Sequence, residues 1–429
     1  MSQWLEKLRS KLVLFLIFLS CTITFEKKIL IEDKVENRKT PGINFLNYEE
    51  AINEGYYNEV ENFLKRNKNK IKGNSSLAFA EGKIKLVKGN IKKSIEIFNE
   101  LLEYTSPAVP VYRKTLWNLS IAYYFNNEFF KASEMAERAN KGGQPVDKGF
   151  RNFLKISPKE IYKTNNFFVE NKFEYLKKKI PIIEINLNDR LKEKAVIDTG
   201  ASLSFISLSL AEELNIEITD DLKSQGFGFH QKLIPVWLSY LSSIEIDKLK
   251  IYNVPVMIFR DDDLTFGTFK VRAGIGFHLI KEGILNLDFK NRFFSFKIYK
   301  EEEKEEGNLL FLGLRAGVEI TINGAGYYNF ILDTGSEKTY ITNNGAKKAL
   351  LSEKLNLFDV ITRGIGKARV EYRKIEDSTV GLGMYKIWYS NILLKNEDSR
   401  YVDGILGNDF LENFKVVMDF PKNKINIML

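Results

Sequence analysis

The tripeptide Asp-Thr-Gly occurs twice in the chain, at residues 198–200 within AVIDTGASLSFIS and at residues 333–335 within FILDTGSEKTYIT. Each copy follows a short apolar run, which is typical of a buried strand, and each is followed at the same distance by an aromatic residue and an isoleucine. One such tripeptide is a weak signal. Two copies in the same context predict two related halves, each presenting an aspartate at the end of a strand.

The residue types in this tripeptide suit a reactive carboxyl group. After a buried strand, Thr and a conformationally permissive Gly let the aspartate turn its carboxylate to a loop tip, where backbone and hydroxyl groups donate to it. Two such carboxylates brought face to face cannot both ionise, because like charges a few ångströms apart raise one pKa strongly. The pair shares a proton, so one member can take a proton from water while the other donates to a carbonyl oxygen.

Residues 198–202 (DTGAS) resemble the active-site loop of retropepsins, and residues 333–336 (DTGS) are similar to that of pepsins and retropepsins. The resemblance continues with AGIG at 273–276 and GILG at 404–407, an element that in this family threads beneath the catalytic loop. It covers about residues 176–429 and implies an all-β, double-lobed acid-protease fold. It also implies catalytic roles for Asp198 and Asp333, with loop support from Thr199, Gly200, Thr334, Gly335 and Ser336.

The same resemblance places a flap hairpin in each half, over residues 224–232 and 362–369. We expect these flaps to close over an extended peptide, and aromatic side chains beside the first of them to line a subsite for apolar side chains. The flap and substrate-binding residues are then Gly226, Phe227, Gly228, Phe229, Gly364, Ile365 and Gly366.

The two halves differ at three positions near the tripeptides. Gly274 replaces an apolar residue, and His278 stands where the second half has Asp409, so we expect the packing of the first lobe to differ there. We interpret His278 as a packing or surface residue. Ala201 is matched by Ser336, whose hydroxyl would favour a charged Asp333 by donating to it, leaving the shared proton on Asp198. The alternative is that Ser336 only caps its loop.

The first residues resemble a bacterial lipoprotein signal. A basic stretch precedes the apolar run LVLFLIFL at 12–19, which is too short to span a bilayer comfortably, and Ser20-Cys21 follows at once. Phe18 stands where this motif usually has Leu. We expect export to the cell envelope and a lipid anchor on Cys21 that attaches the protein to the membrane, with residues 22–44 as a tether. A signal peptide cut nearby, or an uncleaved anchor with an incidental cysteine, is the alternative.

Residues 45–150 have the 3.6-residue period of amphipathic helices. Gly55, Gly89 and Asn127 occupy matching positions in successive segments, and the first two are separated by the 34-residue period of tetratricopeptide repeats. The segments resemble that family, without its Trp-Leu-Gly signature. Such a stack either docks a protein partner or substrate, or acts as a spacer that packs on the protease part.

Composition allows several domains and limits the chemistry. The chain has 429 residues, 44% of them hydrophobic, and a net charge of +8 that is spread over the sequence, so we expect no nucleic-acid partner. Two His and one Cys exclude a zinc or disulfide framework, and we expect no cofactor. The predicted parts are a signal (1–21), a tether (22–44), helical repeats (45–150), a linker (151–175), lobe 1 (176–300), an acidic linker (301–307) and lobe 2 (308–429), whose last strand joins a sheet with the other lobe.

Together these features predict an aspartic endopeptidase that hydrolyses a peptide or protein substrate. Because both halves lie in one chain, tethering gives an effective concentration that lets a monomer form the site. Two alternatives stay open. The chain is a peptide-binding or scaffold protein that kept the fold and lost turnover, or lobes of two chains exchange partners in a dimer.

Overall fold

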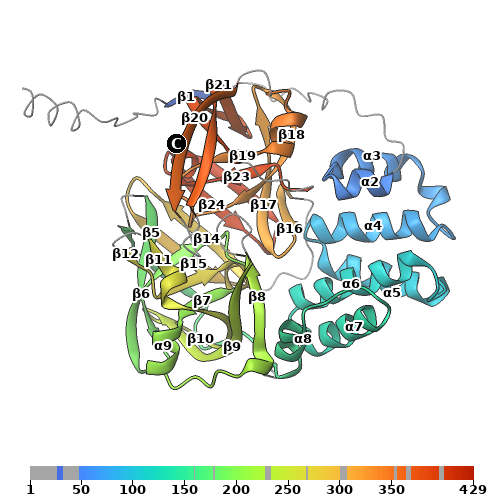
Figure 1. Cartoon of the computed structure of the whole chain (residues 1–429), viewed down its shortest axis with the longest axis horizontal. Coiled ribbons are helices and arrows are strands. Elements are labelled where there is room, and N and C mark those ends of the chain that lie inside the picture. The colour runs from blue at the N-terminus through green and yellow to red at the C-terminus, as the bar shows by residue number, and fades with distance from the viewer. Residues whose placement is uncertain are drawn as a thin grey trace, which may run out of the picture.

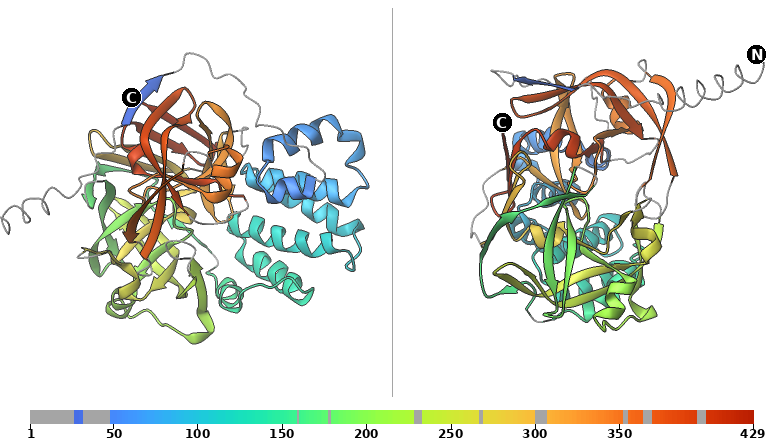
Figure 2. Two further views of the ribbon diagram at one scale, coloured as in Figure 1. Left: turned by 45° about the horizontal axis from the view of Figure 1, so that its top comes forward. Right: turned by 90° about the vertical axis from the view of Figure 1, so that its left-hand side faces the viewer.

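The computed structural model describes residues 27–31, 48–158, 160–176, 179–227, 233–266, 269–299, 307–351, 355–363, 369–395 and 401–429. A helical part lies beside two β lobes and contacts both of them (Figure 1, Figure 2). Within these ranges no helix has the length and apolar character needed to cross a membrane.

The helical part consists of helices that pack as antiparallel neighbours along the chain. Three hairpin turns are centred on Gly55, Gly89 and Asn127, which all have left-handed φ angles of 83°, 74° and 61°. The sequence alignment of these three positions therefore identifies the turns. The helices are α2 (Tyr48–Asn53), α3 (Tyr57–Arg66), α4 (Ser75–Val87), α5 (Ile91–Tyr104), α6 (Pro110–Phe125), α7 (Phe129–Lys141) and α8 (Lys148–Lys155).

Lobe 1 is built on a nine-stranded sheet with the order β2-β10-β7-β13-β6-β5-β9-β8 and with β4 paired to β5. Its catalytic-loop candidate lies between β6 and β7, and β13 runs parallel to β6 beneath that loop. Its elements are β2 (Lys163–Thr164), β4 (Glu174–Leu176), β5 (Ile180–Leu187), β6 (Leu191–Asp198), β7 (Ser204–Ser207), α9 (Leu208–Glu213), β8 (Lys223–Phe227), β9 (Leu233–Ile246), β10 (Leu249–Phe259), β11 (Thr265–Phe266), β12 (Phe269–Lys270), β13 (Ala273–Gly276) and α10 (Phe277–Ile280).

Lobe 2 repeats this topology strand for strand, in the order β1-β22-β19-β23-β18-β17-β21-β20, with β16 paired to β17. The edge position that β2 fills in lobe 1 is filled here by β1, from the predicted tether. The elements are β1 (Lys27–Ile31), β16 (Leu309–Leu312), β17 (Arg315–Ile322), β18 (Ala325–Leu332), β19 (Tyr340–Thr342), α11 (Asn343–Lys348), β20 (Leu355–Arg363), β21 (Arg369–Leu382), β22 (Tyr385–Lys395), β23 (Gly404–Leu406) and α12 (Asn408–Leu411).

A five-stranded sheet joins the two lobes in the order β25-β24-β14-β15-β3. The C-terminal strand lies in this sheet, as its apolar sequence predicts. The segment 151–175, predicted as a linker, instead supplies β2, β3 and part of β4 to lobe 1. The strands of this sheet are β3 (Phe168–Lys172), β14 (Gly283–Asp288), β15 (Phe293–Ile298), β24 (Lys415–Asp419) and β25 (Lys424–Met428).

The hairpin turns of the helical part face the lobes. The Asn329 side chain donates to the carbonyl of Gly55 at 2.7 Å, and Asn423 donates to the carbonyl of Lys88, so two turns contact lobe 2. The third turn contacts lobe 1, through Asn127, which donates to Glu282 at 3.0 Å. The helical part therefore packs on both lobes along one edge.

An aromatic cluster fills the junction of the three parts. The ring of Phe125, at the end of α6, lies 6.1 Å from that of Phe277 in lobe 1 and 4.9 Å from that of Phe311 in lobe 2. Phe277 and Phe311 also contact each other, with 5.4 Å between ring centroids. One continuous core thus links the helical part with both lobes.

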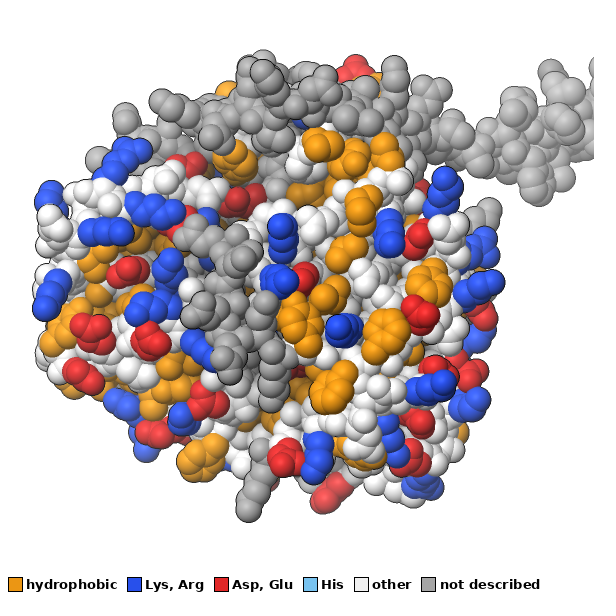
Figure 3. Space-filling model, turned by 180° about the vertical axis from the view of Figure 1, so that it is seen from behind, with side chains coloured by type: hydrophobic (Ala, Val, Ile, Leu, Met, Phe, Trp, Pro, Cys, Tyr) orange, Lys and Arg blue, Asp and Glu red, His pale blue; other side chains and the backbone are white. Residues whose placement is uncertain are grey.

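Charge is mixed on the surface seen in Figure 3. Lys and Arg side chains alternate there with Asp and Glu across the helical part and the lobes. This distribution is that of a solvated surface, in line with the spread of charge along the sequence.

Candidate active site

The two Asp-Thr-Gly loops present their aspartates at the ends of equivalent strands. Asp198 is the last residue of β6, and Asp333 directly follows β18. Oδ1 of Asp198 accepts the backbone N–H groups of Gly200 at 3.0 Å and Ala201 at 2.9 Å, and Oδ1 of Asp333 accepts that of Gly335 at 2.8 Å. Backbone donors therefore orient both carboxyl groups, as the tripeptide chemistry predicts.

The two carboxyl groups meet between the lobes. A Cβ atom added to Gly200 would lie 2.4 Å from Cγ of Asp333, and one added to Gly335 would lie 2.6 Å from Cγ of Asp198. Each glycine is required because the opposite carboxyl group packs against it. The two carboxyl groups lie close enough for each to shift the pKa of the other.

Thr199 and Thr334 tie the loops together below the carboxyl groups. The backbone N–H of each threonine donates to the hydroxyl of the other at 3.1 Å. Each hydroxyl in turn donates at 2.6 Å to a carbonyl of the opposite lobe, that of Leu332 for Thr199 and that of Ile197 for Thr334. Both threonines are fully buried, so this reciprocal network fixes the relative position of the loops.

The electrostatic environment differs between the two aspartates. Burial, and then the charge of Asp333, raises the pKa of Asp198 to about 8. Burial also raises the pKa of Asp333, but the positive charge of Arg315, the N–H of Gly335 and the hydrogen bond from Asp198 oppose the rise. The arrangement favours a proton on Asp198 and a charge on Asp333, which is the direction predicted from the sequence.

Of the two roles expected for Ser336, the structure shows the one within its own loop. The Ser336 hydroxyl donates to the carbonyl of Lys338 at 2.9 Å and braces its own loop, which is the alternative role considered for it. The influence of Arg315 could not be predicted from the sequence. This residue lies on β17, outside the tripeptide loops, and the β16–β17 hairpin brings it to the site.

Strands β13 and β23 support the loops from below. Gly276 lies beside Asp198 in the parallel pairing, and the carbonyl of Leu406 accepts the N–H of Asp333 at 3.1 Å. The departure at Gly274 has a steric reason, since a Cβ there would lie 2.2 Å from the ring of Phe205. The aromatic ring fills the space that a larger residue at 274 would need.

The predicted flap residues are described in part. Gly226 and Phe227 lie in β8, where they pair with Ile234 and Leu233 of β9. The second hairpin is formed by β20 and β21. The other predicted flap residues and the lipidation candidate lie outside the described residues, namely Gly228, Phe229, Gly364, Ile365, Gly366 and Cys21.

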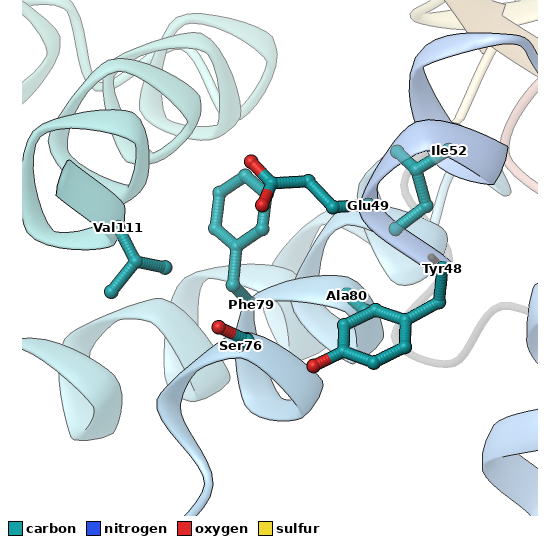
Figure 4. Close-up of a pocket in the computed structure, with 7 residues that line it drawn as sticks. All are labelled: Tyr48, Glu49, Ile52, Ser76, Phe79, Ala80 and Val111. Carbon is teal, nitrogen blue, oxygen red and sulfur yellow. The ribbon is translucent and has the colours of Figure 1, made fainter. Parts of the chain in front are cut away.

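A cavity between α2, α4 and α6 is distant in sequence from this site (Figure 4). Its volume is about 10 Å³, which accommodates no more than about one water molecule. The cavity is lined by Tyr48, Glu49, Ile52, Ser76, Phe79, Ala80 and Val111.

Comparison with known proteins agrees with this two-lobed arrangement. Residues 183–272 and 318–410 each match the family model described as Aspartyl protease. Similar solved structures include a retropepsin-like aspartic protease from Rickettsia conorii, with 16% identity over 32% of this chain and 97% of that chain and a TM-score of 0.23. They also include the aspartic proteinase from Irpex lacteus, with 10% identity over 62% of this chain and 97% of that chain and a TM-score of 0.38.

A search of curated proteins found no match. The family model nevertheless covers both lobes and includes both Asp-Thr-Gly loops. The match supports an aspartic protease fold for the two β lobes and a protease-type function.

Proposed function

We propose that the protein is an aspartic endopeptidase in which Asp198 and Asp333 activate one water molecule. The observation that carries this proposal is that the two carboxyl groups meet across the lobe interface, each packed against the glycine of the opposite Asp-Thr-Gly loop. A pair that holds one proton contains both a base and an acid at the same place.

In the first step the water oxygen attacks the carbonyl carbon of the scissile peptide bond. The Asp333 carboxylate takes a proton from the water, while the Asp198 carboxyl gives its proton to the carbonyl oxygen. The product is a neutral tetrahedral diol, and the proton now lies on Asp333. The rigid Thr199–Thr334 network keeps both carboxyl groups in place during this exchange.

In the second step the diol collapses. The proton on Asp333 moves to the amide nitrogen, the C–N bond breaks, and a diol hydroxyl returns its proton to Asp198. The leaving amine and the new carboxylic acid depart, and the pair again holds one proton. No other group has to change its protonation state.

The decisive experiment is cleavage of a peptide library at several pH values by the wild-type chain and by the variants Asp198→Asn and Asp333→Asn. We expect wild-type cleavage that each substitution abolishes. Cleavage that survives in either variant rules out the pair mechanism. Absence of wild-type cleavage at every pH favours the peptide-binding or scaffold alternative.

A monomer is the proposed active form, since one chain supplies both carboxyl groups and both threonines. Sedimentation of the active protein tests this proposal. Activity confined to a dimer fraction supports the exchange of lobes between two chains.

We also propose that the helices form a tetratricopeptide-like stack. The repeated left-handed turns support this, and the face of α2, α4 and α6 away from the lobes is the place for a protein partner. Cross-linking from Glu50, an exposed residue of α2, tests for such a partner.

The proposed location is the outer side of a bacterial membrane, through a lipid on Cys21. This proposal rests on the sequence pattern of the first residues. Labelling of cells with a radioactive fatty acid, for the wild type and for Cys21→Ser, tests it. Equal labelling of both forms, or a soluble wild-type protein, rules the anchor out.

A further inference from the structure

His278 and Asp409 occupy equivalent positions in the two lobes but contact different partners. Asp409, in α12, accepts the backbone N–H and the hydroxyl of Thr339, both at 2.7 Å, and so stabilises the loop of its own lobe. His278, in α10, is completely buried and faces the helical part instead. Its Nδ1 hydrogen-bonds with the hydroxyl of Tyr162, and its Nε2 lies 3.2 Å from the carbonyl of Tyr124.

These contacts define the state of the imidazole ring. A carbonyl can only accept, so Nε2 carries the hydrogen and donates to Tyr124, while Nδ1 accepts from the Tyr162 hydroxyl. Burial and the positive charge of Lys281 lower the pKa of His278 well below its usual value, which keeps the ring neutral. The Nε2 atom therefore joins lobe 1 to α6 of the helical part, and the Nδ1 atom joins α10 to the residue just before β2.

The backbone of α10 connects this ring to the aspartate loop. The N–H of His278 donates to the carbonyl of Ser202 at 3.2 Å, and that of Phe277 donates to the carbonyl of Ala201 at 2.7 Å. The N–H of Ala201 donates in turn to Oδ1 of Asp198. Hydrogen bonds and the short backbone segments between them thus connect α6 to the carboxyl group of Asp198.

The backbone conformation of Tyr162 indicates that this connection has a function. Its φ of 57° is left-handed, a strained conformation for an aromatic residue, and it is held in place by β2, which begins at the next residue. This backbone conformation places the Tyr162 hydroxyl where it hydrogen-bonds with His278. Aromatic rings surround the imidazole, with centroids at 4.4 Å for Tyr124 and 5.6 Å for Phe129.

A second pair of contacts fixes α10 from its other end. Lys281 donates to the side-chain oxygen of Asn127 at 3.2 Å, and Asn127 donates to Glu282 at 3.0 Å. The turn between α6 and α7 therefore contacts the two residues that follow α10, on the C-terminal side of His278. The equivalent residue after α12 is Glu412, which pairs with Lys179 at 3.0 Å.

We propose that His278 is a positioning residue through which the helical part holds the Asp198 loop in its reactive geometry. This inference rests on the proposed peptidase function. It makes the helical part a component of the catalytic unit rather than an appended module. The asymmetry between His278 and Asp409 is then the adaptation that lets lobe 1 receive the helices.

The kinetic test compares Tyr162→Phe, His278→Ala and His278→Gln with the wild type. We expect His278→Ala to lower kcat by roughly 10- to 100-fold with little change in KM, because small displacements of reacting groups cost rate rather than binding. Tyr162→Phe should lower kcat less. His278→Gln should recover much of the activity, since its amide can donate to the Tyr124 carbonyl.

The pH profile distinguishes a positioning role of His278 from a general loss of structure. If the loop loosens, Asp198 loses N–H donors that lower its pKa, so the alkaline limb of the rate profile should move to higher pH. Phe130→Ser, an exposed change in the same helical part, should alter neither kcat nor the limb. A folded His278→Ala or Tyr162→Phe protein with wild-type kcat and an unmoved limb overturns the inference.

Hydrogen exchange gives an answer that is independent of turnover. In Tyr162→Phe, which keeps the ring and removes one hydroxyl, the amides of Gly200 and Ala201 should exchange faster while that of Gly335 stays unchanged. If the substitution changes the exchange rate of the Gly335 amide as much as those of Gly200 and Ala201, the positioning role is overturned. Faster exchange in a protein that cleaves nothing retains the coupling and rejects the peptidase function.

Discussion

Thr199 and Thr334 are each other's hydrogen-bond partners, with the N–H of each donating to the hydroxyl of the other at 3.1 Å. The two hydroxyl groups are buried and also donate to carbonyls of the opposite lobe. Loss of one hydroxyl therefore removes the partner of a backbone N–H and of a carbonyl, both of which lie in the opposite lobe.

Substitution of Thr199 by Val should destabilise the protein by about 1–3 kcal/mol, since buried donors and acceptors become unsatisfied. Thr199→Ser keeps the hydroxyl and should cost much less. Urea unfolding of both variants measures the difference. Equal stability of the Val and Ser variants would show that the hydroxyl network contributes nothing.

Replacement of Arg315 by Met should move the acidic limb of the pH–rate profile upward. The positive charge of Arg315 lowers the pKa of Asp333, so its removal lets Asp333 take up a proton at higher pH, where the pair loses its base. Ser336→Ala should leave this limb unmoved, because its hydroxyl donates to the carbonyl of Lys338. The reverse result for the two variants contradicts this assignment.

The wild-type alkaline limb should lie near the pKa of Asp198, which is about 8. Above that pH the acid of the pair has lost its proton. A rate that stays constant well past this pH would mean that Asp198 is not the proton donor. Initial rates on one cleaved peptide across the range give the measurement.

Asp198→Asn should raise the melting temperature at neutral pH. The folded-state pKa of about 8 lies above the usual value of 3.8, so stability is full below about pH 4 and declines as the pH rises toward 8. Asn stays neutral and avoids that loss, and the gain should vanish toward pH 4. Calorimetry at both pH values tests this.

For Asp288→Asn, the expected effect of pH on stability has the opposite sign to that for Asp198→Asn. Hydrogen bonds from Asn291 outweigh partial burial and lower the pKa of Asp288, so its charged form stabilises the fold at neutral pH and that contribution is lost on acidification. The substitution should therefore not stabilise the protein at neutral pH. Stabilisation by both variants would point to a general charge effect.

Gly55→Ala and Gly73→Ala form a matched pair. Both glycines have a φ of 83°, so substitution by alanine at either site costs roughly 1–2 kcal/mol because of the left-handed backbone conformation. A Cβ at Gly73 meets nothing within 4 Å, whereas at Gly55 it lies 2.5 Å from the Asn329 side chain. Urea unfolding should show a larger loss for Gly55→Ala, and equal losses would mean that the turn does not pack on lobe 2.

Lys348→Met should cost about 3–5 kcal/mol, because it leaves the buried carboxylate of Asp403 without its counter-charge. The equivalent pair in lobe 1 joins Arg272 and Glu213 at a more exposed position, and Arg272→Met should cost less than about 1 kcal/mol. Chemical unfolding compares the two. A similar cost for both would mean that the helical part does not bury the Lys348 pair.

The sequence was sufficient for those features that depend on local pattern. Each Asp-Thr-Gly loop carries its own strand, turn and donors, so the meeting of Asp198 and Asp333 followed from the repeat. The turn at Asn127 was found in the same way, since it occupies the position of two glycines.

Features that depend on contacts between residues far apart in the sequence could not be predicted from it. Strand β3 has one buried side chain, Val169, so no alternation distinguishes it from a linker. The departure at His278 was visible in the sequence, but its partners Tyr124 and Tyr162 come from segments whose placement only the tertiary fold defines. Arg315 acts across a hairpin in the same manner.

The reversed polarity of the two equivalent ion pairs makes the halves non-interchangeable. Lys348 donates to the carbonyl of Glu54 in the turn between α2 and α3, whereas lobe 1 has Glu213 at the position equivalent to Lys348. A chimera made from two copies of lobe 1 would set a carboxylate against that carbonyl, and the turn between α2 and α3 would lose its hydrogen bonds to lobe 2.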